Sequence, residues 1–359
     1  MVDSVLGVYT QENAGHNTLD MKAIRGLDGT IISCSAPGRA GIVGNPTDMY
    51  GGSVVSCSLN DRAYCHILPS DHLVIKMGSD SLDIAGLSDL ELRKDQFDLA
   101  RAALRALEID IVSDKFLIDL RTDVPEQAGL AGSTAMLAST VGALLTYLGL
   151  QLNRYEIAEM VKGIEYRVMD LICGYQDHYM AVFGGLNFMD FRGKESMEQS
   201  PDEPFATVEP LDEIVAGLPM ILAHTGIKRN SGAVHRSLRH RWLDGHPDVV
   251  EGYKRIAELG RLGKKALVLQ DWEELGRLMN ENHAIQRDLG GSGESNEILI
   301  KAALDNGAYG AKLAGAGQGG TIIALTDSPD EMGEALLRAG AKRVFGLGPS
   351  EGLVSERRL

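Results

Sequence analysis

The sequence predicts an α+β fold with two domains. Its 359 residues exceed what one hydrophobic core usually serves. Strand-like segments and glycine-rich loops dominate the first half, whereas the second half mixes strands with amphipathic helices. The Pro- and acid-rich stretch at 198–210 is the candidate linker between the halves. We therefore expect a loosely held extension over 1–29, a first domain over 30–205 and a second domain over 206–359.

Composition and charge restrict the partners of the chain. Lys and Arg number 35 against 50 Asp and Glu, so the net charge of −15 disfavours binding to nucleic acid or to acidic membranes. No apolar run is long enough to span a membrane, and residues 1–30 lack a secretory signal pattern. The cysteines form no CxxC pair and no His/Cys metal spacing, which predicts reduced thiols, no zinc site and a cytoplasmic location. These cysteines are Cys34, Cys57, Cys65 and Cys173.

The first half reads as strands that lead into glycine loops. The β-branched stretch at 30–33 and a second strand at 53–59 flank a loop at 35–52 that is rich in Gly and Pro. A further strand at 116–121 runs into the loop at 124–136, and helical spacing begins at Ser133. The pattern is therefore strand, glycine loop, helix.

Helical patterns dominate the rest of the chain. Asn153 can cap a helix whose apolar face continues to Leu171. After the candidate linker we expect a strand at 219–223 and helices near 249–269, 272–288 and 295–306. A glycine-rich segment at 312–326 follows them.

The loop PEQAGLAGST places Gly129 and Gly132 directly before a helix. Free backbone N–H groups and the positive end of the helix dipole would meet a polyphosphate there. Ser133 and Thr134 could add hydroxyl groups to phosphate or magnesium. A plain turn with a Ser/Thr cap gives the same pattern, so this loop alone decides little.

The segment GAGQGG at 315–320 satisfies the GxGxxG pattern of dinucleotide-binding oxidoreductases. That fold needs further strands and crossover helices and an acidic residue about 20 positions on. Few residues remain after the segment, and Ala339–Ala341 occupy the position of the acidic residue. A Walker loop is also excluded, because GKE at 193–195 and GKK at 263–265 lack the required Ser or Thr.

Three segments in this order resemble the three motifs of the GHMP kinases: APGRAGIVGNPTD at 36–48, PEQAGLAGSTA at 125–135 and KLAGAGQGG at 312–320. The resemblance implies an N-terminal domain like domain 2 of ribosomal protein S5, a ferredoxin-like C-terminal domain and a site between them. It also implies ATP as the phosphate donor, with Mg²⁺. The nucleotide contacts that it implies are Gly129, Leu130, Ala131, Gly132, Ser133, Thr134, Gly315, Gly317 and Gly319.

The resemblance further implies that Arg39 and Asp177 form the catalytic pair. A carboxylate can take the proton of a sugar hydroxyl, and a guanidinium keeps it ionised and neutralises the transferred phosphoryl group. Ser133 and Glu165, which lies 12 positions before Asp177, would hold the magnesium ion. Without the resemblance, Asp177 reads as a helix-terminal polar residue and Glu165 as part of a solvated helix face.

Two departures from the family pattern bear on these assignments. The second motif reads GLAGST where many members have GLGSS, which leaves open whether Ser133 or Thr134 is the magnesium ligand. The third motif has Gln318 where a loop that approaches phosphate usually has glycine.

Within the family, the segments GNPTD at 44–48, 175–191, 235–245 and 278–289 resemble glucuronokinases. This implies that Arg39, Asn45, Asp48 and Asp177 bind the sugar, and that D-glucuronate is phosphorylated on its anomeric hydroxyl. Galactokinases have Glu at the position of Asn45, and its charge would repel a uronate. The substrate carboxylate also needs a cation, for which the unranked candidates are Lys228, Arg229 and Arg236.

Other functions stay open on sequence grounds. They are another GHMP sugar kinase, similar to galactokinase or to a heptose-phosphate kinase, a sugar and nucleotide sensor without catalytic activity on the same fold, and an oxidoreductase that rests on GAGQGG alone. For the kinase the partner is a small sugar or uronic acid substrate, and the chain is expected as a monomer or homodimer.

Overall fold

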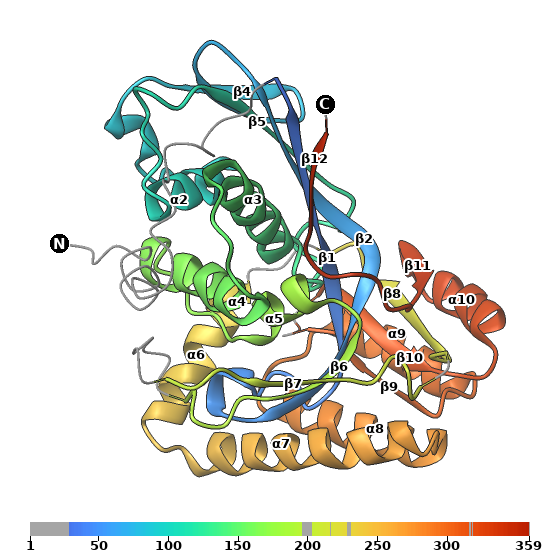
Figure 1. The fold of residues 1–359 in the computed structure, drawn as a ribbon. Helices are drawn as coiled ribbons and strands as arrows, with labels where there is room; N and C mark the ends of the chain where they lie inside the picture. Colours follow the sequence, from blue (N-terminus) through green and yellow to red (C-terminus); the bar gives the residue numbers. More distant parts are fainter. Residues whose placement is uncertain are drawn as a thin grey trace.

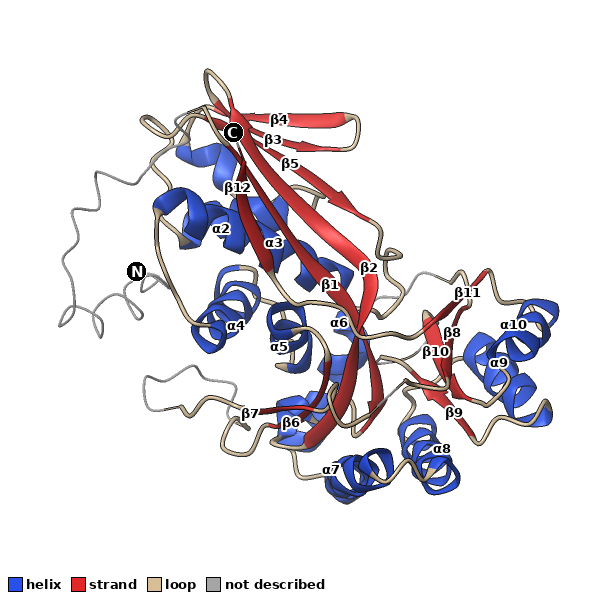
Figure 2. Ribbon diagram, turned by 45° about the vertical axis from the view of Figure 1, so that its right-hand side comes forward, coloured by secondary structure: helices blue, strands red, loops and turns tan. Residues whose placement is uncertain are grey.

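The computed structural model describes residues 29–195, 203–215, 217–227, 231–315, 317 and 319–358, with only the backbone described over 231–236. It contains two β-sheets with helices packed against them (Figures 1 and 2). The expected α+β architecture is therefore confirmed.

The first sheet has eight strands and contains two long ones, β1 (Ile31–Val43) and β2 (Ser53–Pro69). Its main path runs β12-β1-β2-β5-β3-β4, and β6 pairs with β2 and with β7. Of these pairs only β3 and β5 run parallel. The other strands are β3 (Leu73–Met77), β4 (Asp80–Ile84), β5 (Phe116–Thr122), β6 (Leu186–Asp190), β7 (Thr207–Pro210) and β12 (Val354–Arg358).

Helices α2 to α5 cover one face of this sheet, as Figure 1 shows beside β1 and β2. The central one is α3 (Gly132–Leu148), which is buried along almost its whole length because it packs on β1, β2 and the neighbouring helices. The others are α2 (Asp98–Ala106), α4 (Arg154–Gly163) and α5 (Gln176–Phe183), with a π-helical turn η3 (Ile164–Val168) after α4 and short 3-10 turns η1 (Asp48–Tyr50) and η2 (Leu87–Leu90).

The second sheet has the order β11-β8-β10-β9, and all its strands are antiparallel. Ile221 and Ala223 of β8 pack in one core with residues of α9 and α10, whereas Met220 and Leu222 join residues of α7 and α8 in another. The strands are β8 (Met220–His224), β9 (Gly310–Leu313), β10 (Thr321–Leu325) and β11 (Arg343–Gly346); the helices are α6 (Ser231–Leu243), α7 (Pro247–Val268), α8 (Trp272–Asp288), α9 (Glu294–Asp305) and α10 (Pro329–Arg338).

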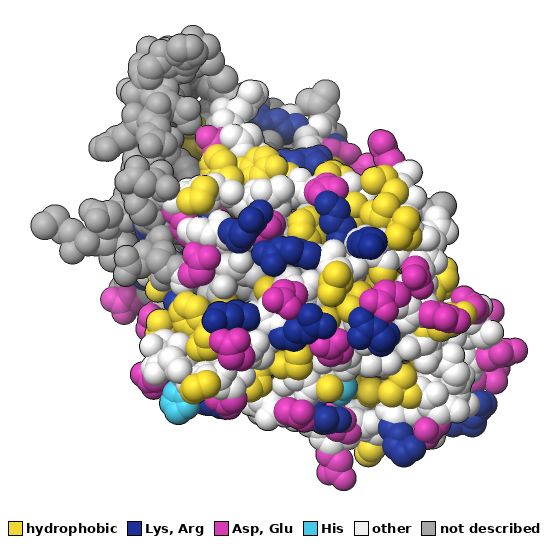
Figure 3. Space-filling model, turned by 90° about the horizontal axis from the view of Figure 1, so that it is seen from below, with side chains coloured by type: hydrophobic (Ala, Val, Ile, Leu, Met, Phe, Trp, Pro, Cys, Tyr) yellow, Lys and Arg dark blue, Asp and Glu magenta, His cyan; other side chains and the backbone are white. Residues whose placement is uncertain are grey.

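One hydrophobic core joins the two halves. It contains Ile42 and Val55 of the first sheet together with Leu278 of α8 and Ile323 of β10. In Figure 3, which views the molecule from below α7 and α8, acidic and basic side chains intermingle. Ion pairs such as Arg255 with Glu281, at 2.7 Å, join α7 and α8 on this side. In the described part of the chain, no helix is both long and apolar enough to cross a membrane.

The predicted helices at 249–269, 272–288 and 295–306 are confirmed as α7, α8 and α9. The expected loop at 35–52 is wrong over its first part, because β1 continues to Val43 and only the residues after it turn back. Asn153 caps α4 as predicted, since its side chain accepts the N–H of Tyr155 and of Glu156. The helix does not continue to Leu171, however: it changes to a π turn at Ile164.

The domain boundary at residue 205 remains a prediction. Residues 196–202 of the expected linker lie outside the described residues, but β7 pairs with β6 and so belongs to the first sheet. The last strand, β12, also returns to the first sheet, where it pairs with β1. Residues 1–28 of the expected extension lie outside the described residues as well.

Candidate active site

A cavity of about 280 Å³ contains most of the predicted site residues. All three glycine-rich motifs contribute to its wall, together with η3 and the start of α5. The predicted residues that line it are Arg39, Asn45, Asp48, Gly129, Ala131, Gly132, Ser133, Thr134, Glu165, Asp177 and Gly315. Three others, Leu130, Gly317 and Gly319, are not among its lining residues.

The predicted catalytic pair is an ion pair at this cavity. Arg39 donates from Nε to Oδ1 of Asp177 at 2.7 Å, and its terminal nitrogen lies 2.5 Å from the same oxygen. The other terminal nitrogen donates to the carbonyl of Gly129 at 2.7 Å. A register irregularity of β1 next to Arg39 accompanies this placement, as β-bulges often do at sites that aim a side chain. The guanidinium therefore links the first motif, the second motif and α5.

Asp48 holds the start of α5 rather than standing free in the cavity. Its Oδ2 accepts the backbone N–H of Tyr175 at 2.7 Å and that of Gln176 at 2.9 Å. Burial raises the pKa of Asp48 and the nearby Asp177 raises it further, whereas the two N–H donors and Arg39 lower it. Gly174 leaves the room for this contact, because a Cβ there would lie 1.9 Å from Oδ2 of Asp48. The carboxylate thus positions the turn that carries Asp177.

The second motif forms the N-terminus of α3. Ala131 has a φ of 59°, which is unusual for a residue with a Cβ, and no side chain caps the helix that starts at Gly132. The first N–H groups of α3 therefore remain available to an anion in the cavity. Leu130 contributes differently from the expectation: its side chain is buried in the core and its carbonyl accepts the N–H of Arg39 at 2.9 Å.

Side chains of α8 and α9 hold the third motif. Gln286 donates to the carbonyl of Gly315 at 3.1 Å, and Asn296 bonds both the N–H and the carbonyl of Gly319. Gly317 has a φ of 94°, and a Cβ there would lie 1.7 Å from the carbonyl oxygen of Gly291. The expectation about Gln318 falls outside the described residues.

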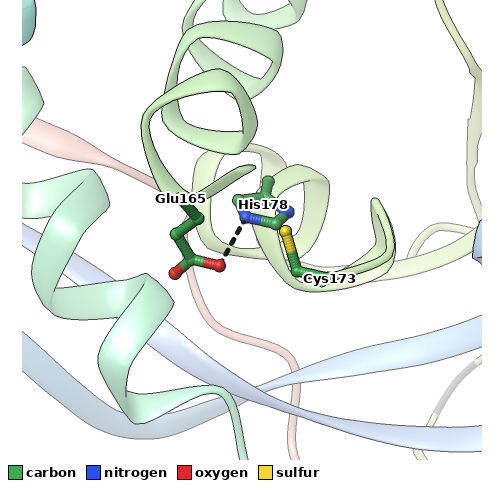
Figure 4. Close-up of side chains that lie close together, drawn as sticks. All are labelled: Glu165, Cys173 and His178. Carbon is green, nitrogen blue, oxygen red and sulfur yellow. Dashed lines mark hydrogen bonds and ion pairs between the residues drawn. The ribbon is translucent and has the colours of Figure 1, made fainter. Parts of the chain in front are cut away.

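Glu165 lies on the π turn and uses both carboxylate oxygens. Oε1 accepts the hydroxyl of Thr134 at 2.9 Å, and Oε2 lies 2.9 Å from Nε2 of His178 (Figure 4). The second-motif hydroxyl that bonds Glu165 is therefore that of Thr134, while Ser133 lines the cavity and is exposed. Sequence reasoning missed His178, although it directly follows Asp177.

Lys312 is a second residue that the sequence analysis missed. Its ammonium is fully buried and donates to Oδ1 of Asn45 at 2.7 Å and to the carbonyl of Leu313 at 2.6 Å. Burial, and secondarily the charge of Arg39, lowers the pKa of Lys312 to about 7. The bond to Lys312 fixes the orientation of the Asn45 amide. Among the described residues, Nδ2 of Asn45 has no hydrogen-bond partner although it is buried.

The predicted cations for a substrate carboxylate are not resolved by the structure. Lys228 and Arg229 lie outside the described residues, as does the side chain of Arg236. Arg239 of the same segment is buried, lies over the ring of Trp242 and donates to the carbonyl of Met49 at 3.2 Å. Arg239 therefore has a structural role, because it bonds the backbone at Met49, which directly follows the first motif.

Comparisons with known proteins match both halves of the chain to domains of one family. Residues 98–185 match the GHMP kinases N terminal domain, and residues 264–343 match the GHMP kinases C terminal domain. The chain is 29% identical to probable glucuronokinase 2 of Arabidopsis thaliana, with 86% of this chain and 88% of the relative covered. It is 26% identical to the mevalonate kinase of Thermococcus gammatolerans, with 90% and 97% covered. Lactococcus lactis galactokinase, solved with galactose, has the same fold, with a TM-score of 0.71, 18% identity and coverage of 98% and 99%.

Three glycine-rich motifs around one cavity between an S5-like and a ferredoxin-like domain define a kinase of small molecules. The chain belongs to the GHMP kinases and is a phosphotransferase with an alcohol group as acceptor. The predicted fold and family are thereby confirmed.

Proposed function

We propose that the protein transfers the γ-phosphate of ATP to the anomeric hydroxyl of a uronic acid, with D-glucuronate as the favoured substrate. The observation that carries the proposal is the neutral Asn45 at the cavity, with an unpartnered Nδ2 and the Lys312 ammonium behind its Oδ1. Nδ2 of Asn45 can donate a hydrogen bond to the carboxylate of a uronate, and the nearby ammonium of Lys312 attracts the charge of that carboxylate. The similarity to proteins named as glucuronokinases supports the same substrate class.

The phosphates of ATP would lie at the N-terminus of α3, where the N–H groups of Gly132 and Ser133 lack a side-chain cap. Gly315 of the third motif would close the cavity from the other side. The donors near Glu165 fit Mg²⁺, because a carboxylate and the hydroxyl groups of Thr134 and Ser133 are hard oxygen ligands. When bound, the ion would neutralise charge on the phosphates.

Asp177 would accept the proton of the attacking hydroxyl group, while Arg39 orients this carboxylate and stabilises charge on the transferred phosphoryl group. Asp48 serves the reaction indirectly, since its bonds to Tyr175 and Gln176 set the position of α5. Each of these groups comes from a different segment, so the catalytic geometry depends on the packing of β1 against α3 and α5.

Charge accounts for the choice of a uronate over a neutral hexose. A carboxylate at position 45 would repel the carboxylate of a uronate by about 4 kcal/mol at a separation of about 4 Å and an effective dielectric constant of about 20. Asn45 removes this repulsion. The Asn45→Glu variant should therefore lose uronate turnover and gain preference for the neutral hexose.

The test is ADP release across a panel of free sugars that includes glucuronate, galacturonate, glucose, galactose and a heptose phosphate, with the phosphorylated position identified by NMR. We expect the highest kcat/KM for a uronate, and a reversed preference in Asn45→Glu. Asn60→Glu is the matched control, because Asn60 is exposed and outside the cavity. A wild-type preference for a neutral sugar or for the heptose phosphate would overturn the uronate assignment but not the kinase assignment.

A further inference from the structure

Glu165, Cys173 and His178 form a cluster of three potential metal ligands. One ligand atom from each residue lies within 4.8 Å of the other two. All three residues line the cavity, and they come from the π turn, the loop before α5 and α5 itself (Figure 4). The carboxylate, the sulfur and the imidazole therefore converge from three segments of the chain.

The imidazole of His178 is incompletely satisfied by the protein. The side chain is fully buried, and Nε2 directs its hydrogen to Oε2 of Glu165, because an ionised carboxylate can only accept. Among the described residues, Nδ1 has no hydrogen-bond partner. A buried polar atom without a partner is destabilising. Because Nδ1 has no partner among the described residues, the ring hydrogen can move from Nε2 to Nδ1 without breaking a bond there, which frees Nε2, next to Oε2 of Glu165, for a cation.

The chemistry of these three side chains determines which cation they favour. Mg²⁺ prefers oxygen ligands throughout, so a thiol and an imidazole add nothing to its binding. Zn²⁺ and Co²⁺ accept sulfur, nitrogen and carboxylate oxygen together, and three protein ligands with an open fourth position are typical of reactive sites. Bonds of about 2.0–2.1 Å in a tetrahedron place the nitrogen and oxygen ligands about 3.3 Å apart. The observed separation of 2.9 Å between Nε2 and Oε2 needs to open only slightly.

We propose that Glu165, Cys173 and His178 bind a thiophilic divalent cation such as Zn²⁺, and that this ion competes with Mg²⁺ for Glu165 and inhibits phosphoryl transfer. Binding replaces the Sγ–H bond of Cys173 by a bond from sulfur to the metal and releases that proton to water, while the imidazole hydrogen of His178 moves from Nε2 to Nδ1. The binding claim is independent of the sugar substrate. The claim of inhibition rests on the proposed role of Glu165 at magnesium.

Cobalt absorption tests the binding claim directly. Full-length protein, freed of metal and without nucleotide, is titrated with Co²⁺ while the charge-transfer band from sulfur to cobalt is recorded. We expect the band in wild type and in Cys34→Ala, which removes a buried cysteine elsewhere, and its loss in Cys173→Ser. His178→Gln, which can still donate to Glu165, should weaken cobalt binding by at least about tenfold. Absence of the band in wild type, or its retention in Cys173→Ser, would overturn the proposal.

Inhibition is measured separately as ADP release at fixed ATP and Mg²⁺ with increasing Zn²⁺. The activity of each protein is first normalised to its own value without Zn²⁺. The Zn²⁺ concentration for half inhibition should then be at least about tenfold higher in Cys173→Ser than in wild type. Equal inhibition of both proteins would refute competition at this site. If none of the sugars in the panel is phosphorylated, the proposed substrate fails while the cobalt spectrum still decides the metal site.

Discussion

Replacing Lys312 by Met tests the electrostatic basis of substrate choice. The change removes the ammonium that lies 2.7 Å from Oδ1 of Asn45 and keeps a long side chain in a fully buried position. The amide of Asn45 then loses both the cation behind it and the bond that sets its orientation. Binding of a uronate should weaken, whereas binding of a neutral hexose should change little.

The size of the effect follows from the geometry. If Nδ2 of Asn45 donates to the substrate carboxylate at about 2.9 Å, the carboxylate lies about 6–7 Å from Nζ of Lys312. Two opposite charges at that separation attract by about 2.5 kcal/mol at an effective dielectric constant of about 20. The KM for glucuronate should therefore rise about 60-fold.

The pH dependence gives a second readout. Because the pKa of Lys312 is lowered to about 7, the ammonium is charged below this pH and loses its charge as the pH rises through it. A bound carboxylate favours the charged form, so the KM of wild type should increase above neutral pH, and this increase should be absent in Lys312→Met. Burial of the charged form also costs stability. The folded protein binds fewer protons than the unfolded chain between about pH 7 and 10.5, so this group makes stability rise with pH over that range.

The assay is kcat/KM for glucuronate and glucose between pH 6 and 9, with Lys301→Met as the control because Lys301 is exposed and paired with Asp305. Thermal unfolding of both variants shows that they fold. If Lys312→Met binds glucuronate as tightly as wild type at pH 6, the ammonium plays no part in recognising the carboxylate.

Three further changes test the reaction and the loops. Asp177→Asn should lower kcat by about 10²–10⁴-fold and leave ATP affinity nearly intact, because Arg39 can still bond the side chain oxygen; a variant with more than half of the wild-type kcat would contradict the assignment of the base. Gly174→Ala should lower kcat at least about tenfold, because its Cβ displaces Asp48 from the start of α5. The control Gly346→Ala should leave kcat unchanged, because nothing lies within 4 Å of the added atom. Equal kcat values for the two variants would show that Asp48 does not position Asp177. Gly132→Val should weaken ATP·Mg²⁺ binding measured by calorimetry, because the side chain crowds both the phosphate approach and Val124, at 3.2 Å; an unchanged Kd would leave this loop with a purely structural role.

Local sequence patterns were sufficient for the fold class and the family. Helices α7, α8 and α9 follow from the 3.6-residue spacing of apolar side chains, and α4 from the cap at Asn153. The three glycine motifs identified the family because their order and separation are visible along the chain. Long elements with one buried face are predictable, since their pattern repeats over several turns.

The extent of β1 was not predictable in the same way. Gly38 and Gly41 make the segment look like a loop, yet it is a strand because it pairs with β2 as far as Val43, whereas β12 pairs only with Ile31–Ser35. A Cβ at Gly38 would lie 2.7 Å from the carbonyl oxygen of Leu130, and one at Gly41 would lie 2.5 Å from Cγ of Asn45. These glycines serve close packing across the site rather than a turn, and only the packed structure distinguishes the two uses.

The roles within the site depend on contacts between distant positions. The sequence by itself determined which residue types are present: a carboxylate at 177, an amide at 45 and the glycines of three motifs. The tertiary structure decided that Asp48 holds α5, that Thr134 rather than Ser133 bonds Glu165, and that His178 and Cys173 adjoin that carboxylate. Lys312 and Asn45 are separated by 267 positions, and Arg39 and Asp177 by 138. Such pairs leave no periodic signal in the chain, because the partners are brought together by burial of the shared core between the two sheets rather than by local spacing.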